Sequence, residues 1–248
     1  MTESRNISLL ITADGSHTLY LPELNETYHS RNGAVQESEY VFIEQGFKEA
    51  SVGKSALSIL EIGFGTGLNA LLTAIKSASA GIKTVMHTLE PYPLELEITG
   101  ELNYTDQLSG CVPGIAANVS VSEPQQVIDM ISAWDNIING PWEQEYTVSA
   151  YFSLKKIKAT LEDFSGPAEV YDLVYFDAFA PNRQPEVWQL SNMVKCYAML
   201  KPGGMLVTYS AQGDMKRTLK EAGFKVRRLK GPPGKWQMVR AAKQIKLE

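Results

Sequence analysis

Residues 57–74 read LSILEIGFGTGLNALLTA, an apolar run followed by three glycines at alternate positions and then an apolar helical pattern. This order predicts a buried strand, a tight turn and a helix, which together form a nucleotide pocket in α/β sheets. Glycine permits positive φ angles and lets a ligand approach the main chain, and the first N–H groups of the helix are unpaired. The chain is therefore expected to fold as a doubly wound α/β sheet with a small polar ligand at this turn.

The spacing of the glycines bears on the identity of the ligand. The dinucleotide pattern is G-x-G-x-x-G, whereas here the third glycine is Gly67 and Leu68 takes the next position. Glu61 ends the strand, where its carboxylate is expected to meet a ligand ammonium. This E-x-G-x-G-x-G strand end resembles the first motif of class I S-adenosylmethionine (AdoMet) methyltransferases, so AdoMet is favoured over NAD. A turn that only connects strand and helix remains an alternative.

Length and residue usage limit the other possibilities. The 248 residues suit one complete catalytic domain with an appendage and are few for two full enzymes. No stretch of about 18 apolar residues occurs, so no membrane span is predicted. The start, MTESRNISLL, lacks a secretory signal pattern, which predicts a cytoplasmic protein. The histidines and cysteines show no ligand-like spacing, so no metal is predicted.

Charge is distributed unevenly along the chain. Residues 211–248 hold 11 Lys/Arg and 3 Asp/Glu, whereas residues 1–210 hold 12 Lys/Arg and 25 Asp/Glu. A basic C-terminal segment of this kind can bind phosphates although the whole chain is acidic. A solvated basic surface without a partner is an equally good interpretation of this feature alone.

The N-terminal segment is expected to be an extension, residues 1–55, ahead of a catalytic domain, residues 56–248. Two strand-like runs flank ADGS, whose Asp14-Gly15 predicts a hairpin turn, and residues 37–50 suit an amphipathic helix. After the glycine loop, residues 83–92 read as the second strand, which ends at Glu90. A carboxylate at this distance from the loop is placed to accept hydrogen bonds from both ribose hydroxyls, and a solvated surface Glu is the alternative.

More than 50 residues separate Glu90 from the next run that reads as a strand, at 146–152. A parallel crossover needs only a dozen or so residues. Residues 92–143 contain helical patterns ended by Gly140-Pro141, so a small helical lobe is predicted there. The lobe either walls the active site or fills out the fold.

The second motif is YDLVYFDAFAPNRQPEVW, residues 171–188. DLVYF reads as a buried parallel strand, and Asp177 stands at its carboxyl end, the edge at which open sheets bind ligands. Asp177 is therefore expected in the catalytic site. In the alternative interpretation Asp177 caps nearby N–H groups and Phe179 fills the core.

The remaining sequence completes the sheet. A fifth strand follows Pro202-Gly203-Gly204, a helix ends at Gly223, and KVRRLK and KWQMVRAA read as a final antiparallel hairpin. The expected fold is thus a Rossmann-like, seven-stranded, mostly parallel sheet with a terminal antiparallel hairpin, an N-terminal β-hairpin extension and an inserted helical lobe. A terminal hairpin after five parallel strands is another resemblance to class I methyltransferases.

Four stretches together resemble one family of that class, the tRNA 5-methylaminomethyl-2-thiouridine methyltransferases. This family is the methyltransferase half of the bifunctional MnmC enzyme and also occurs as a stand-alone form. The resemblance covers nearly the whole chain, and its first stretch discriminates because generic methyltransferases share only the glycine loop. The stretches are DGSHTLYLPELNETYHSRNGAVQESEYVFIE (14–44), LEIGFGTGLNAL (60–71), YDLVYFDAFAPNRQPEVW (171–188) and AGFKVRRLKGPPGKWQMVRA (222–241).

This resemblance implies methyl transfer from AdoMet to the exocyclic amine of 5-aminomethyl-(2-thio)uridine at the wobble position of tRNA, with S-adenosyl-L-homocysteine as product. The chain shows no second glycine-rich nucleotide loop of the form G-x-G-x-x-G, so the family's flavin oxidoreductase half, and with it a flavin, is not expected. The expected partner is the tRNA anticodon stem-loop, held by the basic C-terminal segment and the lobe at 92–143. The choice of tRNAs and the oligomeric state stay open.

The expected site residues fall into three groups. Asp177 and Phe179 are the expected catalytic residues, with Asp177 orienting the amine. Tyr209, Lys235, Arg227 and Arg228 are expected to contact the substrate or the RNA, and Phe179 and Tyr209 to stack on the uracil. The expected cofactor-binding residues are Glu61, Gly63, Gly65, Thr66, Gly67, Asn69, Glu90, Pro91 and Asp177.

Two departures from the resemblance and three rival functions remain. The third strand runs into SLKKIK, where many class I enzymes show an acidic residue for the adenine amine, and Lys235 is followed by Trp236 rather than a basic residue. The rivals are an AdoMet-dependent methyltransferase or aminopropyltransferase acting on another amine, an NAD-dependent oxidoreductase, and a non-catalytic RNA-binding module.

Overall fold

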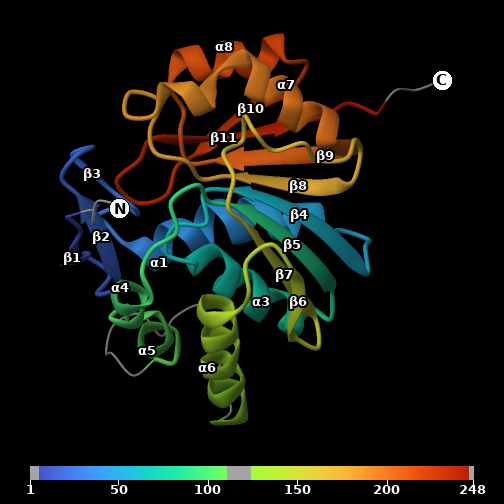
Figure 1. The fold of residues 1–248 in the computed structure, drawn as a ribbon. Coiled ribbons are helices and arrows are strands. Elements are labelled where there is room, and N and C mark those ends of the chain that lie inside the picture. Colours follow the sequence, from blue (N-terminus) through green and yellow to red (C-terminus); the bar gives the residue numbers. More distant parts are fainter. Residues whose placement is uncertain (1–5, 111–123, 246–248) are drawn as a thin grey trace.

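The structure is a computed structural model that describes residues 6–110 and 124–245. Its main sheet has eight strands in the order β10-β11-β9-β8-β4-β5-β7-β6 (Figure 1). The strands are β4 (Ala56–Ile62), β5 (Lys83–Leu89), β6 (Glu145–Ser149), β7 (Phe152–Ile157), β8 (Tyr171–Phe176), β9 (Leu200–Thr208), β10 (Lys225–Lys230) and β11 (Gln237–Ala242).

The five central strands β7, β5, β4, β8 and β9 are parallel, and β11 and β10 follow β9 as an antiparallel pair. All six residues of β8 are buried, as expected for a strand whose two faces are both covered by helices. The predicted fold class is confirmed, with five parallel strands followed along the chain by a terminal antiparallel hairpin, but the sheet has eight strands rather than the predicted seven. One further strand, β6, lies at the edge of the sheet.

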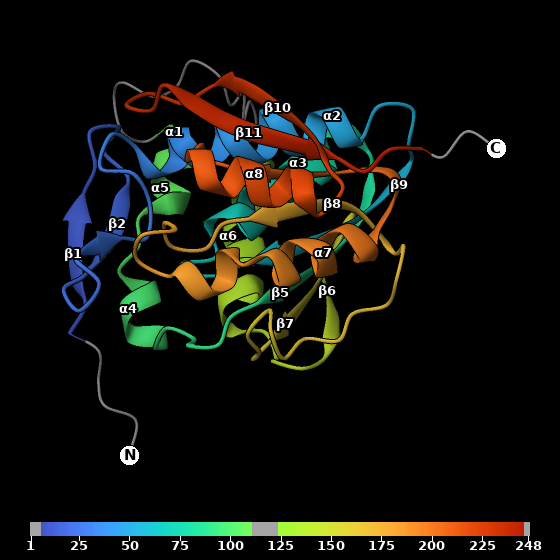
Figure 2. The ribbon, with the colours of Figure 1, turned by 90° about the horizontal axis from the view of Figure 1, so that it is seen from above.

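Helices cover both faces of the sheet (Figure 2). One face is covered by α3 (Leu68–Ala80) and by a continuous helix made of α1 (Ala34–Ser38), the π-helical η1 (Glu39–Phe47) and α2 (Lys48–Ala50). The other face is covered by η2 (Pro185–Trp188), α7 (Leu190–Met199) and α8 (Gly213–Glu221).

The N-terminal helix shares a core with the sheet. Phe42 of η1 packs on Tyr175 of β8 with ring centroids 5.2 Å apart, and Val41, Ile43 and Phe47 are buried in the same cluster. The predicted amphipathic helix is therefore present, and its apolar face is continuous with the core of the main sheet.

The predicted N-terminal hairpin is confirmed and carries one additional short strand. β1 (Ser8–Ile11) pairs with β2 (His17–Leu21), and β3 (Glu26–Thr27) adds to β2. At the turn, Gly15 has a φ of +84°, and the Asp14 carboxylate accepts a hydrogen bond from the Ser16 N–H at 3.0 Å. These are the roles expected of an Asp-Gly turn.

The inserted lobe is helical where the structure describes it. It contains α4 (Leu96–Gly100), α5 (Tyr104–Leu108) and α6 (Pro124–Asn139); residues 111–123 lie outside the described residues. The side chains of Asn103 and Gln107 both donate to the Gly15 carbonyl, at 3.0 and 2.9 Å. The lobe therefore braces the N-terminal hairpin turn.

The prediction of a single strand at 146–152 is wrong. The chain turns at Ala150-Tyr151, so that β6 and β7 form an antiparallel hairpin, and SLKKI belongs to β7 rather than to a loop. Lys156 in this strand is buried and donates to the carbonyls of Ile137 and Ile138 at 2.8 and 2.9 Å. A cation at the last carbonyls of a helix is stabilising, so the Lys156 side chain caps the C-terminus of α6.

Among the residues described, no helix has the length and apolar character needed to cross a membrane.

Candidate active site

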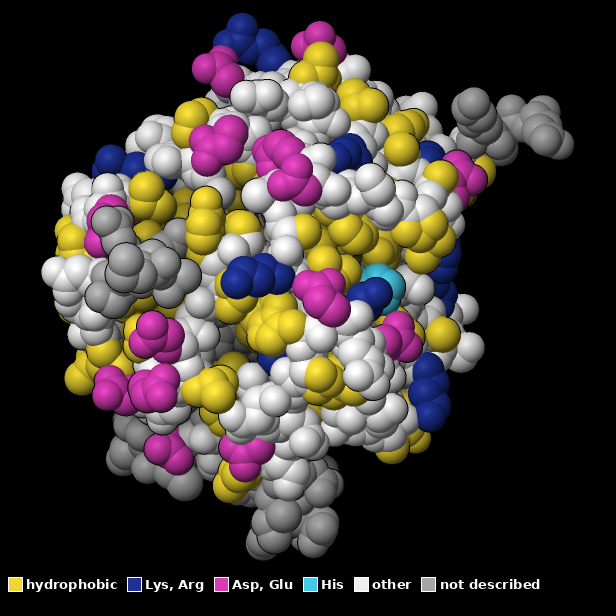
Figure 3. Space-filling model, in the orientation of Figure 1, with side chains coloured by type: hydrophobic (Ala, Val, Ile, Leu, Met, Phe, Trp, Pro, Cys, Tyr) yellow, Lys and Arg dark blue, Asp and Glu magenta, His cyan; other side chains and the backbone are white. Residues whose placement is uncertain are grey.

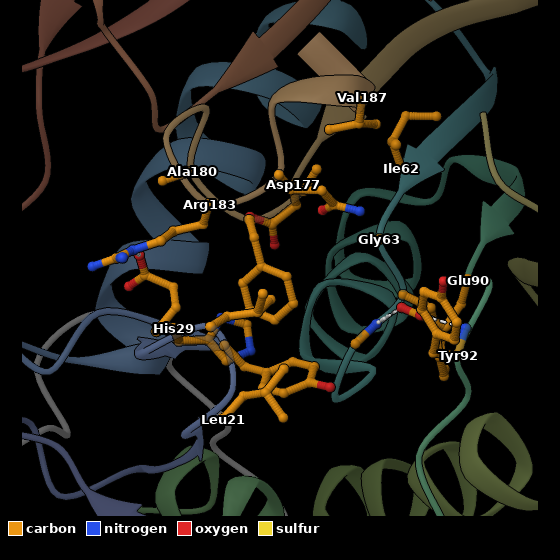
Figure 4. Close-up of a pocket in the computed structure, with 18 of the residues that line it drawn as sticks. Leu21, His29, Ile62, Gly63, Glu90, Tyr92, Asp177, Ala180, Arg183 and Val187 are labelled. Atoms are coloured by element: carbon orange, nitrogen blue, oxygen red, sulfur yellow. Dashed lines mark hydrogen bonds and ion pairs between the residues drawn. The ribbon is translucent and has the colours of Figure 1, made fainter. Parts of the chain in front are cut away.

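A cavity of about 970 Å³ opens at the carboxyl edge of the parallel strands. Its walls come from the ends of β4, β5, β7 and β8, and from residues 21–37 of the N-terminal segment, which close it from the opposite side. Figure 3 shows apolar side chains gathered in the middle of one face, with single charged side chains beside them. In the close-up of the cavity, Gly63 lies between Asp177 and Glu90 (Figure 4).

The glycine loop follows β4 as predicted. Gly63, Gly65 and Gly67 have φ angles of +92°, +51° and +83°, a region that residues with a Cβ rarely adopt. A Cβ on Gly63 would also lie 2.6 Å from the Asp177 carbonyl oxygen. Gly63 is thus required both by its backbone angles and by the close approach of the loop to β8.

Glu90 is fixed on the wall of the cavity. Its carboxylate accepts hydrogen bonds from the Gly65 N–H at 3.0 Å and from the Tyr92 N–H at 2.9 Å. Pro91 lines the same wall. The predicted ribose-binding carboxylate therefore lies beside the glycine loop.

Asp177 lies at the end of β8 and lines the cavity, where its side chain is half-buried. Asn69 Nδ2 donates to Asp177 Oδ2 at 2.8 Å. Burial raises the pKa of Asp177 to about 7, and the nearby Glu37 carboxylate adds to the rise, whereas the hydrogen bond from Asn69 and the Lys235 ammonium oppose it. A carboxyl group with this pKa can hold or release a proton near neutral pH.

Glu61 lies behind the loop rather than on the cavity wall. Its Oε1 accepts from Asn69 Nδ2 at 3.0 Å and its Oε2 accepts from the Thr88 hydroxyl at 2.6 Å. Burial raises the pKa of Glu61 to about 8. Asn69 therefore joins two carboxyl groups, one in the cavity and one beneath it, and the structure offers Glu61 no direct approach to a ligand ammonium.

Aromatic side chains surround Asp177. Phe179 packs edge-on against Tyr28 with ring centroids 5.1 Å apart, and its carbonyl accepts from Trp188 Nε1 at 2.8 Å. The Tyr209 hydroxyl donates to the Ala178 carbonyl at 2.9 Å, which fixes the loop after β8. The cavity therefore has aromatic faces next to a carboxyl group.

Lys235 reaches the cavity from the terminal hairpin. Its ammonium lies 3.8 Å from the centroid of the Tyr209 ring and forms an ion pair with the buried Glu37 of α1. Glu37 also accepts from the Ser30 N–H at 2.9 Å. The N-terminal segment and the terminal hairpin thus meet at one side of the site.

Thr66 joins the glycine loop to the N-terminal segment and the lobe. Its hydroxyl lies 2.7 Å from His29 Nε2 and accepts from the Tyr104 hydroxyl at 3.1 Å. Burial lowers the pKa of His29 to about 4, so this imidazole is neutral near pH 7. The lobe therefore supports the loop from behind, and among its described residues Tyr92 is the one that lines the cavity.

Arg227 and Arg228 do not line the cavity; both are exposed on β10. Neighbouring residues of a strand point to opposite faces, so the two guanidinium groups lie on opposite faces of the sheet. Lys230 pairs directly with Gln237, which lines a second cavity, and Arg228 shares the face of Lys230. Sequence reasoning could not separate these two arginines because it did not fix the register of the hairpin.

Several lining residues were not identified from the sequence. Thr160, Leu161 and Glu162 follow β7 and line the cavity, so an acidic residue does follow the third parallel strand. The sequence prediction missed Glu162 because it ended this strand at residue 152 instead of Ile157. Tyr28 and Glu37 of the N-terminal segment and Arg183 of the loop after β8 also line the cavity. The sequence indicated them only through the family resemblance of residues 14–44 and 171–188.

The described residues contain no group of three or more His, Cys, Asp or Glu side chains that could hold a metal ion.

Comparisons with known proteins agree with this geometry. A family model described as S-adenosyl-L-methionine-dependent methyltransferase matches residues 129–244. Among solved structures, MNMC2 from Aquifex aeolicus has a TM-score of 0.69 at 23% identity, over all of this chain and 74% of that chain. A spermidine synthase from Thermotoga maritima has a TM-score of 0.57 at 14% identity, over 99% of this chain and 72% of that one. These likenesses show the fold.

Curated relatives carry the name tRNA 5-methylaminomethyl-2-thiouridine biosynthesis bifunctional protein MnmC. The one from Cupriavidus necator is 29% identical over 230 residues, which are 90% of this chain and 32% of the relative. The one from Paraburkholderia xenovorans is 30% identical over 221 residues, which are 86% and 32%. The chain spans about a third of the length of these relatives. The resemblance expected from the sequence is confirmed.

Proposed function

We propose that this chain, a relative of the MnmC proteins over nine-tenths of its length, transfers a methyl group from AdoMet to tRNA. The acceptor is the exocyclic amine of 5-aminomethyl-(2-thio)uridine at the wobble position, reached in the anticodon stem-loop, and the reaction takes place in the cytoplasm without metal or flavin. The division into an extension, residues 1–55, and a methyltransferase domain, residues 56–248, is part of this proposal. The observation that carries it is Asp177 beside the glycine loop in one cavity with Glu90.

The residues present fit AdoMet. Gly63 and Gly65 line the cavity without side chains of their own, whereas Gly67 and Asn69 lie outside its lining. Glu90 supplies two carboxylate oxygens for ribose hydroxyls beside the loop. The segment Thr160–Glu162 lines the cavity beyond Glu90 and is the candidate neighbour of the adenine. When bound, AdoMet supplies an electrophilic methyl group on a sulfonium.

The protein must present the amine of the substrate with a free lone pair. Alkyl amines resemble lysine, with a pKa of about 10.4 in water, so most would enter protonated at neutral pH. The apolar and aromatic lining of the cavity disfavours the charged amine by desolvation. Asp177 then accepts a hydrogen bond from the amine, orients it and takes up its proton, which a carboxyl group with a pKa of about 7 can do.

The aromatic side chains are placed to hold the base. Phe179 and Tyr209 flank Asp177, and a wobble base is unpaired in the free anticodon loop, so its faces are available for stacking. Lys235 lies beside Tyr209 and is ion-paired with Glu37, so it is a candidate hydrogen-bond donor to the RNA backbone rather than a source of net positive charge.

The test uses two parallel incubations, each with its own donor and acceptor. Purified protein is mixed with AdoMet and tRNA from a strain blocked at the aminomethyl stage, and the nucleosides are identified by mass. We expect one added methyl group on 5-aminomethyl uridine. In parallel, decarboxylated AdoMet is supplied with small polyamines, and consumption of polyamine with unchanged tRNA would instead identify an aminopropyltransferase.

A further inference from the structure

The loop between β10 and β11 presents one tryptophan to solvent. Trp236 is 95% exposed, more than any other large hydrophobic side chain among the residues described, whereas Trp134 and Trp188 are buried. A large aromatic surface left in water is unfavourable unless a partner covers it. Trp236 is therefore a candidate contact residue.

The backbone that carries Trp236 is fixed. The Gly231 N–H donates to the Trp236 carbonyl at 3.1 Å, and the Lys235 N–H donates to the Pro232 carbonyl at 2.9 Å. Lys235 turns inward to Glu37 and Tyr209, while Trp236 points outward. The loop that carries the indole is thus already ordered, so binding of a partner costs little backbone entropy there.

Trp236 also lines a second cavity, of about 410 Å³. Ala180, Tyr209 and Lys235 belong to the lining of both this cavity and the catalytic one, so the two adjoin. The second cavity adds the polar side chains of Ser210, Gln212 and Gln237. It therefore offers an aromatic face, amide and hydroxyl groups, and the shared lysine.

This set of groups matches a single-stranded nucleotide. Aromatic side chains stack on unpaired bases, amide groups pair with base edges, and cations bind the phosphates. The basic side chains of Lys230 and Arg228 lie on the same face of the hairpin as Gln237. The positive charge therefore continues outward from the second cavity, as an RNA backbone leaving the catalytic cavity would require.

We infer that Trp236 and the cavity beside it bind the nucleotide next in the chain to the modified uridine, with its base stacked on the indole. This inference rests on the proposed function, because it takes the occupant of the catalytic cavity to be a nucleotide of tRNA. Trp236 does not touch the reacting atoms; it positions the RNA.

The kinetic test compares three variants. Trp236→Ala should raise the KM for tRNA by roughly 5- to 150-fold, the range expected for loss of one stacked base, and leave kcat unchanged. Trp236→Phe retains a stacking surface and should restore most of the affinity. Tyr151→Ala removes another exposed aromatic, in the turn between β6 and β7 and outside both cavities, and should match the wild type. An unchanged KM for Trp236→Ala would overturn the inference.

A binding test uses an anticodon stem-loop RNA without turnover. Binding should quench the fluorescence of the wild type and not that of Trp236→Phe, since the stacked indole is the reporter. An abasic nucleotide beside the target should weaken binding to the wild type and have no effect on Trp236→Ala. Equal weakening in both proteins would contradict the subsite. RNA that quenches Trp236 but is never methylated would overturn the proposed function and leave the subsite standing.

Discussion

At the scale of single residues, the site is built around one shared amide. Asn69 Nδ2 donates to both Glu61 and Asp177, so the carboxyl group in the cavity and the one beneath it are held in a fixed relation. The apolar run that ends at Asp177 predicted its position, because a strand delivers its last residue to the sheet edge. The position of Glu61 at the end of β4 did not predict the side of the loop on which its carboxyl group lies.

Asp177→Asn should lower kcat by about 10²- to 10⁴-fold, the usual contribution of a positioned acid or base. In the wild type, kcat should rise as pH increases through about 7, since the carboxyl group must lose its proton to accept one from the amine. This rise should be absent in the variant. The exposed carboxylate of Asp106 on α5 provides the control Asp106→Asn, which should behave as wild type. Wild-type turnover in Asp177→Asn would refute the assigned role.

Glu61→Gln should change the pH dependence of stability. Burial raises the pKa of Glu61 from 4.5 to about 8, so its proton is bound more tightly in the folded state. The resulting stability is complete below pH 4.5 and is lost as pH rises to about 8. The variant should lack this loss, which is at most about 5 kcal/mol, since one unit of pKa shift corresponds to about 1.4 kcal/mol. Urea unfolding across this range measures it, and parallel pH curves for the two proteins would contradict the prediction.

At the scale of elements, the glycine loop is where local conformation and packing coincide. Gly63 needs a positive φ, and it also has no room for a Cβ beside the Asp177 carbonyl. Gly81, which ends α3, has a φ of +67° but open space around it. The two glycines separate the effect of backbone strain from that of steric conflict.

Gly63→Ala should destabilise the fold by at least about 3 kcal/mol and abolish AdoMet binding, because β4 and β8 must move apart at the site. Gly81→Ala should cost about 1 kcal/mol, from the backbone conformation alone. Thermal unfolding and calorimetric titration with AdoMet give the two readouts. Equal losses of stability in the two variants would show that the packing conflict is absent.

Most elements could be predicted from the sequence, because apolar runs bounded by glycine and proline mark buried strands and the helices between them. The hairpin of β6 and β7 could not. Its turn at Ala150-Tyr151 contains none of the Gly, Asn or Asp residues typical of such turns, and the alternating burial of Lys155 and Lys156 runs against their charge. The capping of α6 by Lys156 is a tertiary contact, and no residue pattern near either position predicts it.

At the scale of the whole molecule, the acidic majority of the chain and its basic C-terminal segment divide two tasks. The glycine loop, Glu90 and Asp177 line the cavity. The basic side chains of the terminal hairpin extend from Lys235 at the cavity to Lys230 and Arg228 on the surface. The sequence predicted the basic C-terminal segment but not which face of the hairpin each basic side chain lies on. The pairing of Lys230 with Gln237 decides which of them face the second cavity.

Arg228→Ala should reduce the slope of log affinity for tRNA against log salt concentration by about 1, as expected for one lost phosphate contact. Arg227→Ala removes the same charge one residue away on the opposite face of β10, and its slope should equal that of the wild type. Binding titrations at several salt concentrations measure both. A larger change in Arg227→Ala than in Arg228→Ala would place the RNA on the other face.

The ion pair between Glu37 and Lys235 joins positions at opposite ends of the sequence. A chain that stops short of Lys235 already holds the glycine loop, Glu90 and Asp177, but it lacks one wall of the cavity. Such a chain has no closed compartment in which to desolvate an amine. Under the proposed function, the site should therefore be competent for catalysis only after the hairpin of β10 and β11 has joined the sheet.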